Sequence, residues 1–141
     1  MKQALVYRAR PQKQKIPDQQ KKKRVLVIAG PTAAGKTQLS LSLAQAIGGE
    51  ILSADSCQVY RGMDIGTAKA SPEERALIAH HLIDICDFST HYNVAEFYKE
   101  AQSSFQEITA RDNVPIVVGG SGFYIHALLY GPPHGPSSIP E

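Results

Sequence analysis

The sequence predicts an α/β fold in which helices flank a parallel sheet, and two observations support this prediction. Short apolar runs alternate along the chain with longer stretches of helical periodicity, which is typical of parallel sheets. In addition, the first apolar run leads through a glycine-rich segment directly into a helical pattern. The predicted strands cover residues 25–29, 50–54, 81–85 and 114–118. Because ligands of such sheets bind at the carboxyl ends of the strands, one site should be lined by residues 30–37, 55–62 and 119–124.

The first strand and the segment after it predict a phosphate-binding loop. Residues 25–29 are rich in β-branched side chains, as a strand buried on both faces should be. The next eight residues read GPTAAGKT, which matches the pattern G-x-x-x-x-G-K-[ST] between a strand and a helix. The fold is therefore expected to be P-loop NTPase-like, and the alternative is a glycine-rich turn without a ligand. The predicted phosphate-binding residues are Gly30, Pro31, Thr32, Ala33, Ala34, Gly35, Lys36 and Thr37.

Each residue type in this loop suits an anion. Gly30 and Gly35 permit a ring of backbone N–H groups to approach a phosphate closely. The helix that starts near Lys36 adds the positive end of its dipole. The Lys36 ammonium can reach the terminal phosphate oxygens, and the Thr37 hydroxyl is a predicted ligand of Mg²⁺. The loop by itself does not identify the phosphate compound.

Capping signals and apolar spacing predict the helices. The first helix should end at Gly48-Gly49, a natural C-cap. Ser71, followed by a proline and two glutamates, predicts the start of a second helix, and Asn93 predicts the start of a third. A last short helix should cover residues 121–129. The first helix is expected to bury Leu39, Leu43, Ala46 and Ile47, and the third to bury Val94, Phe97, Tyr98, Ala101, Phe105 and Ile108.

Composition divides the chain into three parts. Residues 1–24 carry nine basic side chains and one acidic one, a net charge of +8, and are expected to form a basic disordered leader. Such a leader could contact nucleic acid through its lysines or simply be solvated. Residues 25–131 form the predicted α/β core, and the 117 residues from 25 onward carry a net charge of −6. Residues 132–141 read as a linker rich in Pro, Gly and Ser, so the core is expected to be truncated at its C-terminus.

Composition also argues against several classes of site. Cys57 and Cys86 form no C-x-x-C pair, and two lone thiols fit a reducing cytoplasm. The adjacent His80 and His81 cannot share one helix face and have no third ligand at metal spacing, which favours structural roles. No apolar run approaches the ~18 residues that a membrane span requires.

Polar and glycine-rich residues follow the second and fourth predicted strands. Asp55 should face the phosphate-binding loop, where its carboxylate could orient a Mg²⁺-bound water or act as a general base. The Gln58 amide could pair with the edge of a nucleobase. The alternative is a polar loop that Asp55 and Ser56 merely cap. Residues 119–122 read GGSG, which predicts either a second close approach of the backbone to a ligand or a tight turn.

Four runs together resemble the tRNA dimethylallyltransferase family in order and spacing: GPTAAGKT, ILSADSCQVYRGMDIGTAKAS, HHLID and VPIVVGGSGFYIHALLYG. The resemblance covers residues 25–131. It implies transfer of a dimethylallyl group from dimethylallyl diphosphate to the exocyclic N6 amine of the adenosine 3′-adjacent to the anticodon in tRNA. This chain would be the N-terminal catalytic portion of such a prenyltransferase.

The resemblance also implies individual roles. Lys36, Thr37 and Mg²⁺ would neutralise the departing pyrophosphate, Asp55 would accept the amine proton, and the Thr32 hydroxyl would lie close to the reacting groups. Gln58 would read the flipped adenine. The implied catalytic residues are Asp55, Thr32 and Lys36, and the implied tRNA-binding residues are Asp55, Ser56, Cys57, Gln58 and Ser121. Cys57 stands where the family more often has Arg, and Ser121 where it usually has Thr.

The implied partners are tRNA and dimethylallyl diphosphate, with Mg²⁺ as cofactor, for a monomer in the cytoplasm without membrane contact. Three other functions remain open at this point. A P-loop small-molecule kinase would need a lid with paired arginines, whereas residues 25–131 contain only Arg61, Arg75 and Arg111. An adenylate prenyltransferase would use the same diphosphate site with a smaller acceptor. A non-catalytic fragment would bind diphosphate without turnover.

Overall fold

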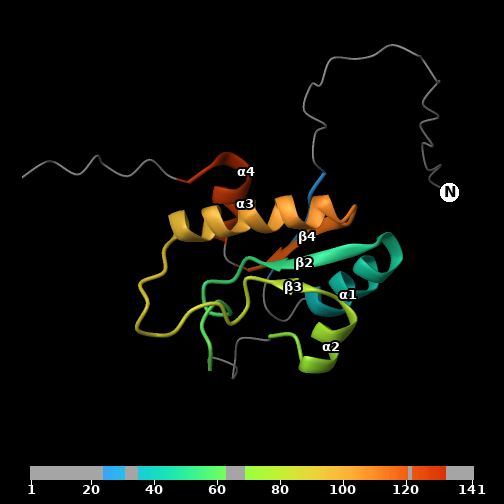
Figure 1. Ribbon diagram of the computed structural model, residues 1–141, viewed down its shortest axis with the longest axis horizontal. Helices are drawn as coiled ribbons and strands as arrows, with labels where there is room; N and C mark the ends of the chain where they lie inside the picture. Colours follow the sequence, from blue (N-terminus) through green and yellow to red (C-terminus); the bar gives the residue numbers. More distant parts are fainter. Residues whose placement is uncertain (1–23, 31–34, 63–68, 121, 133–141) are drawn as a thin grey trace, which may run out of the picture.

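The computed structural model describes residues 24–30, 35–62, 69–120 and 122–132 of the chain. Within these ranges four strands form one sheet in the order β1-β4-β2-β3, with every pairing parallel. Figure 1 shows α3 and α4 on one side of this sheet and α1 on the other, which confirms the predicted α/β fold. The elements are β1 (Leu26–Ala29), α1 (Lys36–Ile47), β2 (Gly49–Ser53), α2 (Pro72–Leu77), β3 (His80–His81), α3 (Val94–Ala110), β4 (Val114–Gly119) and α4 (Gly122–Tyr130).

Strand β1 differs from its prediction because it is not buried on both faces. Leu26 and Ala29 are exposed, and the two residues between them are half-buried. Within the described residues β1 pairs with β4 alone, so it lies at an edge of the sheet. Pairing with β4 places Ala29 beside Gly119, which brings the end of the first strand next to the turn after the fourth.

Helix α1 buries the predicted face only in part, because Leu43 is half-buried against the core while the other three predicted residues are exposed. Leu39 and Ile47 are 51% and 46% exposed, and Ala46 is exposed as well. The buried side chains are instead Ser40 and Ala44, one helical turn apart. Small side chains at this spacing let the helix lie close to β2 and β4, so the largest apolar residues are displaced to the flanks. The predicted C-cap is confirmed, because Gly48 is left-handed (φ 69) and its amide donates to the Ala44 carbonyl.

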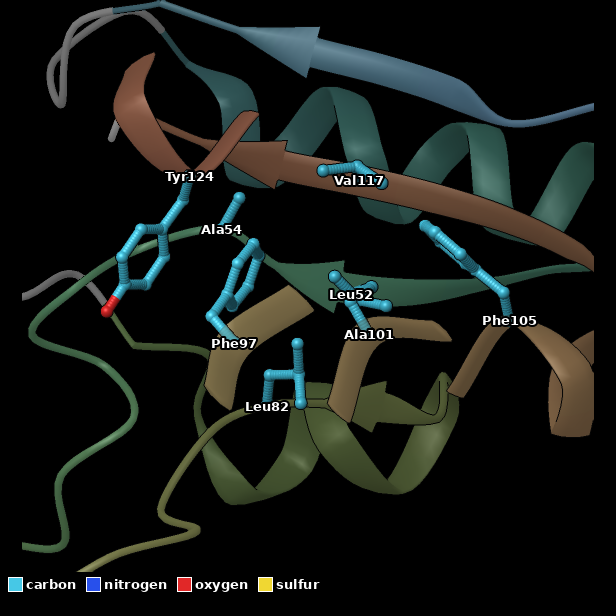
Figure 2. Close-up of a cluster of buried hydrophobic side chains, with 8 residues drawn as sticks. All are labelled: Leu52, Ala54, Leu82, Phe97, Ala101, Phe105, Val117 and Tyr124. Carbon is cyan, nitrogen blue, oxygen red and sulfur yellow. The ribbon is translucent and has the colours of Figure 1, made fainter. Parts of the chain in front are cut away.

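The core on the other face of the sheet lies under α3. The helix starts where predicted, with the Asn93 side chain accepting a hydrogen bond from the Glu96 amide at 2.9 Å. Its predicted stripe is largely confirmed: four of its six residues are buried, while Val94 and Tyr98 are half-buried. Figure 2 shows the aromatic ring of Phe97 beside that of Tyr124 from α4, with ring centroids 4.2 Å apart. The cluster comprises Leu52, Ala54, Leu82, Phe97, Ala101, Phe105, Val117 and Tyr124.

The third strand is shorter than predicted. Only His80 and His81 pair with β2, and the chain then turns because Leu82 and Asp84 adopt left-handed angles (φ 65 and 55). Beyond this turn the backbone pairs with the segment after β2, as the Asp84 amide donates to the Gln58 carbonyl at 2.9 Å. Helix α2 begins as predicted, with Ser71 and Glu74 forming a capping box.

A buried ion-pair network ties the amino ends of the strands together. Glu50 is 4% exposed, and its carboxylate accepts two hydrogen bonds from Arg111 and one from Asn113, at 2.8–2.9 Å. His81 Nε2 lies 2.9 Å from the same carboxylate. Mainly through the Arg111 hydrogen bonds, which outweigh the effect of burial, the pKa of Glu50 falls from 4.5 to about 2. His80 Nδ1 lies 2.7 Å from the Ile78 carbonyl oxygen, so both histidines have contacts within the fold.

Two of the predicted parts fall almost wholly outside the described residues. Of the basic leader 1–24 only Arg24 is described, and of the linker 132–141 only Pro132. None of the helices in the described ranges combines the length and apolar character needed to cross a membrane.

Candidate phosphate-binding site

The three segments that follow the strands meet at one pocket, as the sequence predicts. Its lining includes Lys36 and Thr37 from the start of α1, Asp55 and Gln58 after β2, and the two glycines at the end of β4. The full lining is Lys36, Thr37, Ser40, Ile51, Ser53, Asp55, Gln58, Ala70, His80, Ile83, Val118, Gly119 and Gly120. The pocket therefore lies at the carboxyl ends of the parallel strands, where ligands of such sheets bind.

The second end of the predicted phosphate-binding loop lines this pocket, and a hydrogen bond from Lys36 connects it to the first end. Gly35 is left-handed (φ 73) and precedes the first residue of α1, and as a glycine it offers no side chain to cap that helix start. The Lys36 ammonium donates a hydrogen bond to the Gly30 carbonyl at the other end of the loop. The predicted loop residues Pro31, Thr32, Ala33 and Ala34 lie outside the described residues. A helix start without a side-chain cap leaves backbone N–H groups to an anion, as phosphate binding requires.

The glycines after β4 allow a close approach of backbone segments. A β-carbon at Gly119 would lie 2.2 Å from the Ala54 carbonyl oxygen, so any larger residue would separate β4 from the segment that leads to Asp55. At Gly120, a β-carbon would lie 3.3 Å from the Gly30 carbonyl oxygen and 3.8 Å from Lys36 Nζ. The second glycine-rich turn thus lies against the phosphate-binding loop and its lysine.

Asp55 both caps a turn and faces the pocket. One carboxylate oxygen, Oδ1, accepts hydrogen bonds from the amides of Cys57 and Gln58 at 2.8 and 3.3 Å. Both hydrogen bonds that the structure gives to this carboxylate within the described residues fall on Oδ1. The capping role that the sequence left as an alternative is therefore present, and it occupies one oxygen only. The backbone fixes the orientation of a carboxylate that still lines the pocket.

The remaining predicted tRNA-binding residues divide into three groups. Gln58 lines the pocket, and the buried Ser53 hydroxyl donates to its Oε1 at 2.7 Å, which holds the side chain in place. Ser56 and Cys57 are exposed on the same turn. Ser121 lies outside the described residues.

Sequence reasoning missed several residues that line the pocket. Ser53 is the last residue of β2 and lies two positions before Asp55, and both side chains line the pocket. The alternation of side chains along an extended segment could have revealed Ser53. Ser40 could have been found one turn after Lys36 on the same helix. Ile83 could not have been found in this way, because the direction of its side chain depends on the left-handed residues Leu82 and Asp84 on either side.

The oxygen donors present suit a magnesium ion. The Thr37 hydroxyl and the Asp55 carboxylate both line the pocket, and Mg²⁺ prefers one or two protein oxygens together with waters and substrate phosphates. Among the described residues, no group of three or more His, Cys, Asp and Glu side chains gathers as a dedicated metal site. These donors therefore fit an ion that arrives with a phosphate ligand rather than one held by protein alone.

Together, the parallel sheet, the helix that starts after Gly35 and the lysine at its first position define an α/β protein with a P-loop NTPase-like fold. Comparison with known proteins makes this class more specific. Residues 58–140 match the family model described as IPP transferase, and the chain belongs to this family. The resemblance noted from the four sequence runs is thereby confirmed.

Individual relatives agree with this assignment. A tRNA dimethylallyltransferase of Protochlamydia amoebophila is 63% identical over 123 residues, which cover 87% of this chain and 36% of the relative. A solved tRNA isopentenylpyrophosphate transferase of Bacillus halodurans is 47% identical, with a TM-score of 0.77, over 82% of this chain and 38% of that protein. A eukaryotic dimethylallyltransferase acting on tRNA is 42% identical, with a TM-score of 0.72, over 75% of this chain and 26% of that protein. The chain thus spans about a third of the length of the curated relatives it matches.

Proposed function

We propose that this chain forms the diphosphate-binding and catalytic portion of a tRNA dimethylallyltransferase. The reaction moves a dimethylallyl group from dimethylallyl diphosphate to the N6 amine of the adenosine 3′-adjacent to the anticodon. One observation carries the proposal: Lys36, Asp55 and Gln58 reach a single pocket from two different segments. This chain is 63% identical to a relative named tRNA dimethylallyltransferase, which supports tRNA and a dimethylallyl donor as its ligands.

The leaving group belongs at the Lys36 end of the pocket. As the bond between the dimethylallyl carbon and the diphosphate oxygen breaks, negative charge grows on the pyrophosphate, and the Lys36 ammonium stabilises it. To reach the ligand, this ammonium exchanges its contact with the Gly30 carbonyl for phosphate oxygens. Thr37 would hold Mg²⁺, which would supply further charge neutralisation when bound. In this proposal residues 30–37 form the phosphate-binding loop, and we assign the Thr32 hydroxyl a role beside the reacting groups.

The accepting amine belongs at the Asp55 end. The N6 nitrogen forms the new bond to carbon and gives up one proton, which the Asp55 carboxylate accepts. Because two backbone amides hold Oδ1, the carboxylate is oriented before the adenosine arrives. A base positioned in this way typically contributes a factor of ~10² to 10⁴ to the rate.

The tRNA-binding segment would be the turn that starts at Asp55. Gln58 pairs with the edge of the extruded adenine, while Ser56, Cys57 and Ser121 contact neighbouring parts of the RNA. We further propose that the protein works as a monomer in the cytoplasm with Mg²⁺ as its cofactor. We do not include a membrane among its proposed partners.

The first experiment is calorimetric titration of this chain with dimethylallyl diphosphate and, separately, with ATP, both in the presence of Mg²⁺. Preference for dimethylallyl diphosphate that disappears in Lys36→Ala would support the proposal. Preference for ATP would instead favour a small-molecule kinase. Binding of neither ligand would contradict the proposal for this chain.

A second experiment separates the prenyltransferase alternatives by their acceptor. Mass spectrometry would detect transfer to an anticodon stem-loop RNA, to AMP, or to neither. Transfer to the RNA alone supports the proposed function, and transfer to AMP favours an adenylate prenyltransferase. Diphosphate binding without transfer to either acceptor would identify a non-catalytic fragment.

A further inference from the structure

The pocket that holds Lys36 and Thr37 also has an apolar wall. Ile51 and Val118 reach it from neighbouring strands of the sheet, and Ile83 reaches it from the turn after β3. An inorganic anion gains nothing from such a wall, because its favourable contacts are with cations and N–H groups. The combination of a cationic end and an apolar wall suits a ligand that carries a hydrocarbon group on a phosphate.

Ile83 differs from the other two apolar side chains in how its position is determined. It lies between Leu82 and Asp84, which both have left-handed backbone angles (φ 65 and 55). Such angles are uncommon for residues with a side chain, and least favourable for bulky ones, so the surrounding structure must hold them. Ile83 itself is 6% exposed.

The contacts of Leu82 and Asp84, on either side of Ile83, stabilise these backbone angles. The Leu82 side chain is buried in the cluster under α3, as Figure 2 shows. The Asp84 carboxylate forms ion pairs with Lys69 and with Arg75, the latter at 2.9 Å, and the Asp84 amide donates to the Gln58 carbonyl. The Lys69 side chain is only 6% exposed and also donates to the Tyr60 carbonyl at 2.7 Å. The turn that carries Ile83 is therefore anchored to the core, to α2 and to the segment after β2.

We propose that Ile83 contacts the hydrocarbon group of the diphosphate substrate and sets the length of hydrocarbon that the site accepts. This inference rests on the proposed function. A β-branched side chain has few rotamers, and this one stands on a turn that is anchored on both sides, so it forms a rigid wall. A rigid wall favours a short branched chain and excludes a longer one, whereas a flexible side chain would adapt to either.

The test compares three ligands by calorimetry in the presence of Mg²⁺: inorganic pyrophosphate, dimethylallyl diphosphate and geranyl diphosphate. The variants are Ile83→Ala and the milder Ile83→Val. Ile85→Ala is the matched control, because Ile85 lies on the same segment but does not line this pocket. In Ile83→Ala we expect affinity for dimethylallyl diphosphate to fall about tenfold relative to pyrophosphate, the usual effect of removing a wall contact. Geranyl diphosphate should gain relative to dimethylallyl diphosphate in the same variant.

The outcomes separate this inference from the proposed function. If the affinity ratio of dimethylallyl diphosphate to pyrophosphate is the same in Ile83→Ala and in the wild-type chain, the role of Ile83 is overturned while the proposed function stands. If the wild-type chain binds no dimethylallyl diphosphate, both fail together. Should Ile83→Ala lose pyrophosphate binding through misfolding, Ile83→Val decides, and an unchanged ratio in that variant overturns the inference.

Discussion

The two ends of β2 carry carboxylates that the structure uses in opposite ways. Glu50, at the amino end, is 4% exposed, and its two oxygens contact Arg111, Asn113 and His81. Asp55, just beyond the carboxyl end, is half-buried and receives hydrogen bonds from two backbone amides on one oxygen. A carboxylate surrounded by side-chain donors stabilises the fold, whereas we propose that the one oriented by backbone amides toward the pocket takes part in the reaction. Substitutions at the two ends should therefore change different measured quantities.

The largest expected effect concerns Asp55→Asn. Asparagine can still accept the two amide hydrogen bonds on its oxygen, so the free energy of unfolding should change by less than about 0.5 kcal/mol. The amide cannot accept a proton, and transfer to the RNA should slow by at least about 100-fold in a transfer-competent form of the protein. Titration should find affinity for dimethylallyl diphosphate unchanged. Equal loss of transfer in the control Asp87→Asn, at an exposed ion pair, would contradict the assigned role.

The complementary change is Glu50→Ala at the other end of β2. Removing the carboxylate leaves Arg111, Asn113 and His81 without their shared acceptor. Arg111 is half-exposed and can turn to water, so the loss should stay below the usual range for a broken buried pair, at about 2–3 kcal/mol in urea unfolding. The folded fraction should bind pyrophosphate as the wild-type chain does. Glu100→Ala, at an exposed position on α3, is the control and should change stability little.

The pKa values predict how the amino-end network responds to acid. Because the pKa of Glu50 is lowered from 4.5 to about 2, its contribution to stability is complete above pH 4.5 and disappears as the pH falls toward 2. Between pH 5 and pH 2 the wild-type chain should thus lose about 2 kcal/mol more than Glu50→Gln. Urea titrations of both proteins at each pH measure this difference. Parallel pH profiles for the two would show that Glu50 is not responsible.

The sequence was most informative where structure depends on neighbours along the chain. The start of α3 at Asn93 and the capping box at Ser71 follow from local hydrogen bonds and were predicted. The meeting of three segments at one pocket also followed, because parallel strands present their carboxyl ends at one edge. The predicted nearness of Asp55 to the phosphate-binding loop depends on the same rule.

The features that the sequence did not reveal depend on contacts between residues that are far apart along the chain. The buried face of α1 is set by how closely the helix approaches the sheet, which favours Ser40 and Ala44 over larger apolar residues. The role of Glu50 requires Arg111, which lies 61 residues away. The direction of Ile83 requires left-handed neighbours that no local signal marks, since neither of them is glycine. In each case the physical cause is a tertiary contact that overrides local preference.

The smallest expected effects come from substituting glycines at the two ends of the strands. These substitutions also separate the stabilising end of the sheet from the pocket end most clearly. At the amino end, a β-carbon on Gly49 would lie 2.5 Å from the end of the buried Ile116 side chain. At the carboxyl end, a β-carbon on Gly120 would touch the Gly30 carbonyl and Lys36 Nζ. Gly49→Ala should therefore lower stability by about 1 kcal/mol through repacking, with no change in ligand affinity.

Gly120→Ala should have the opposite effect, lowering ligand affinity while leaving stability nearly unchanged. The added methyl group presses on the phosphate-binding loop and its lysine, so affinity for pyrophosphate should fall about fivefold, or about 1 kcal/mol, while the unfolding free energy stays within about 0.5 kcal/mol. Gly122→Ala is the matched control in the same turn, because a β-carbon there meets nothing within 4 Å. Calorimetry and urea unfolding of the three variants measure both quantities. If Gly120→Ala and Gly122→Ala bind pyrophosphate equally well, the turn after β4 does not shape the phosphate site, and the functional end of the sheet is confined to α1 and the segment after β2.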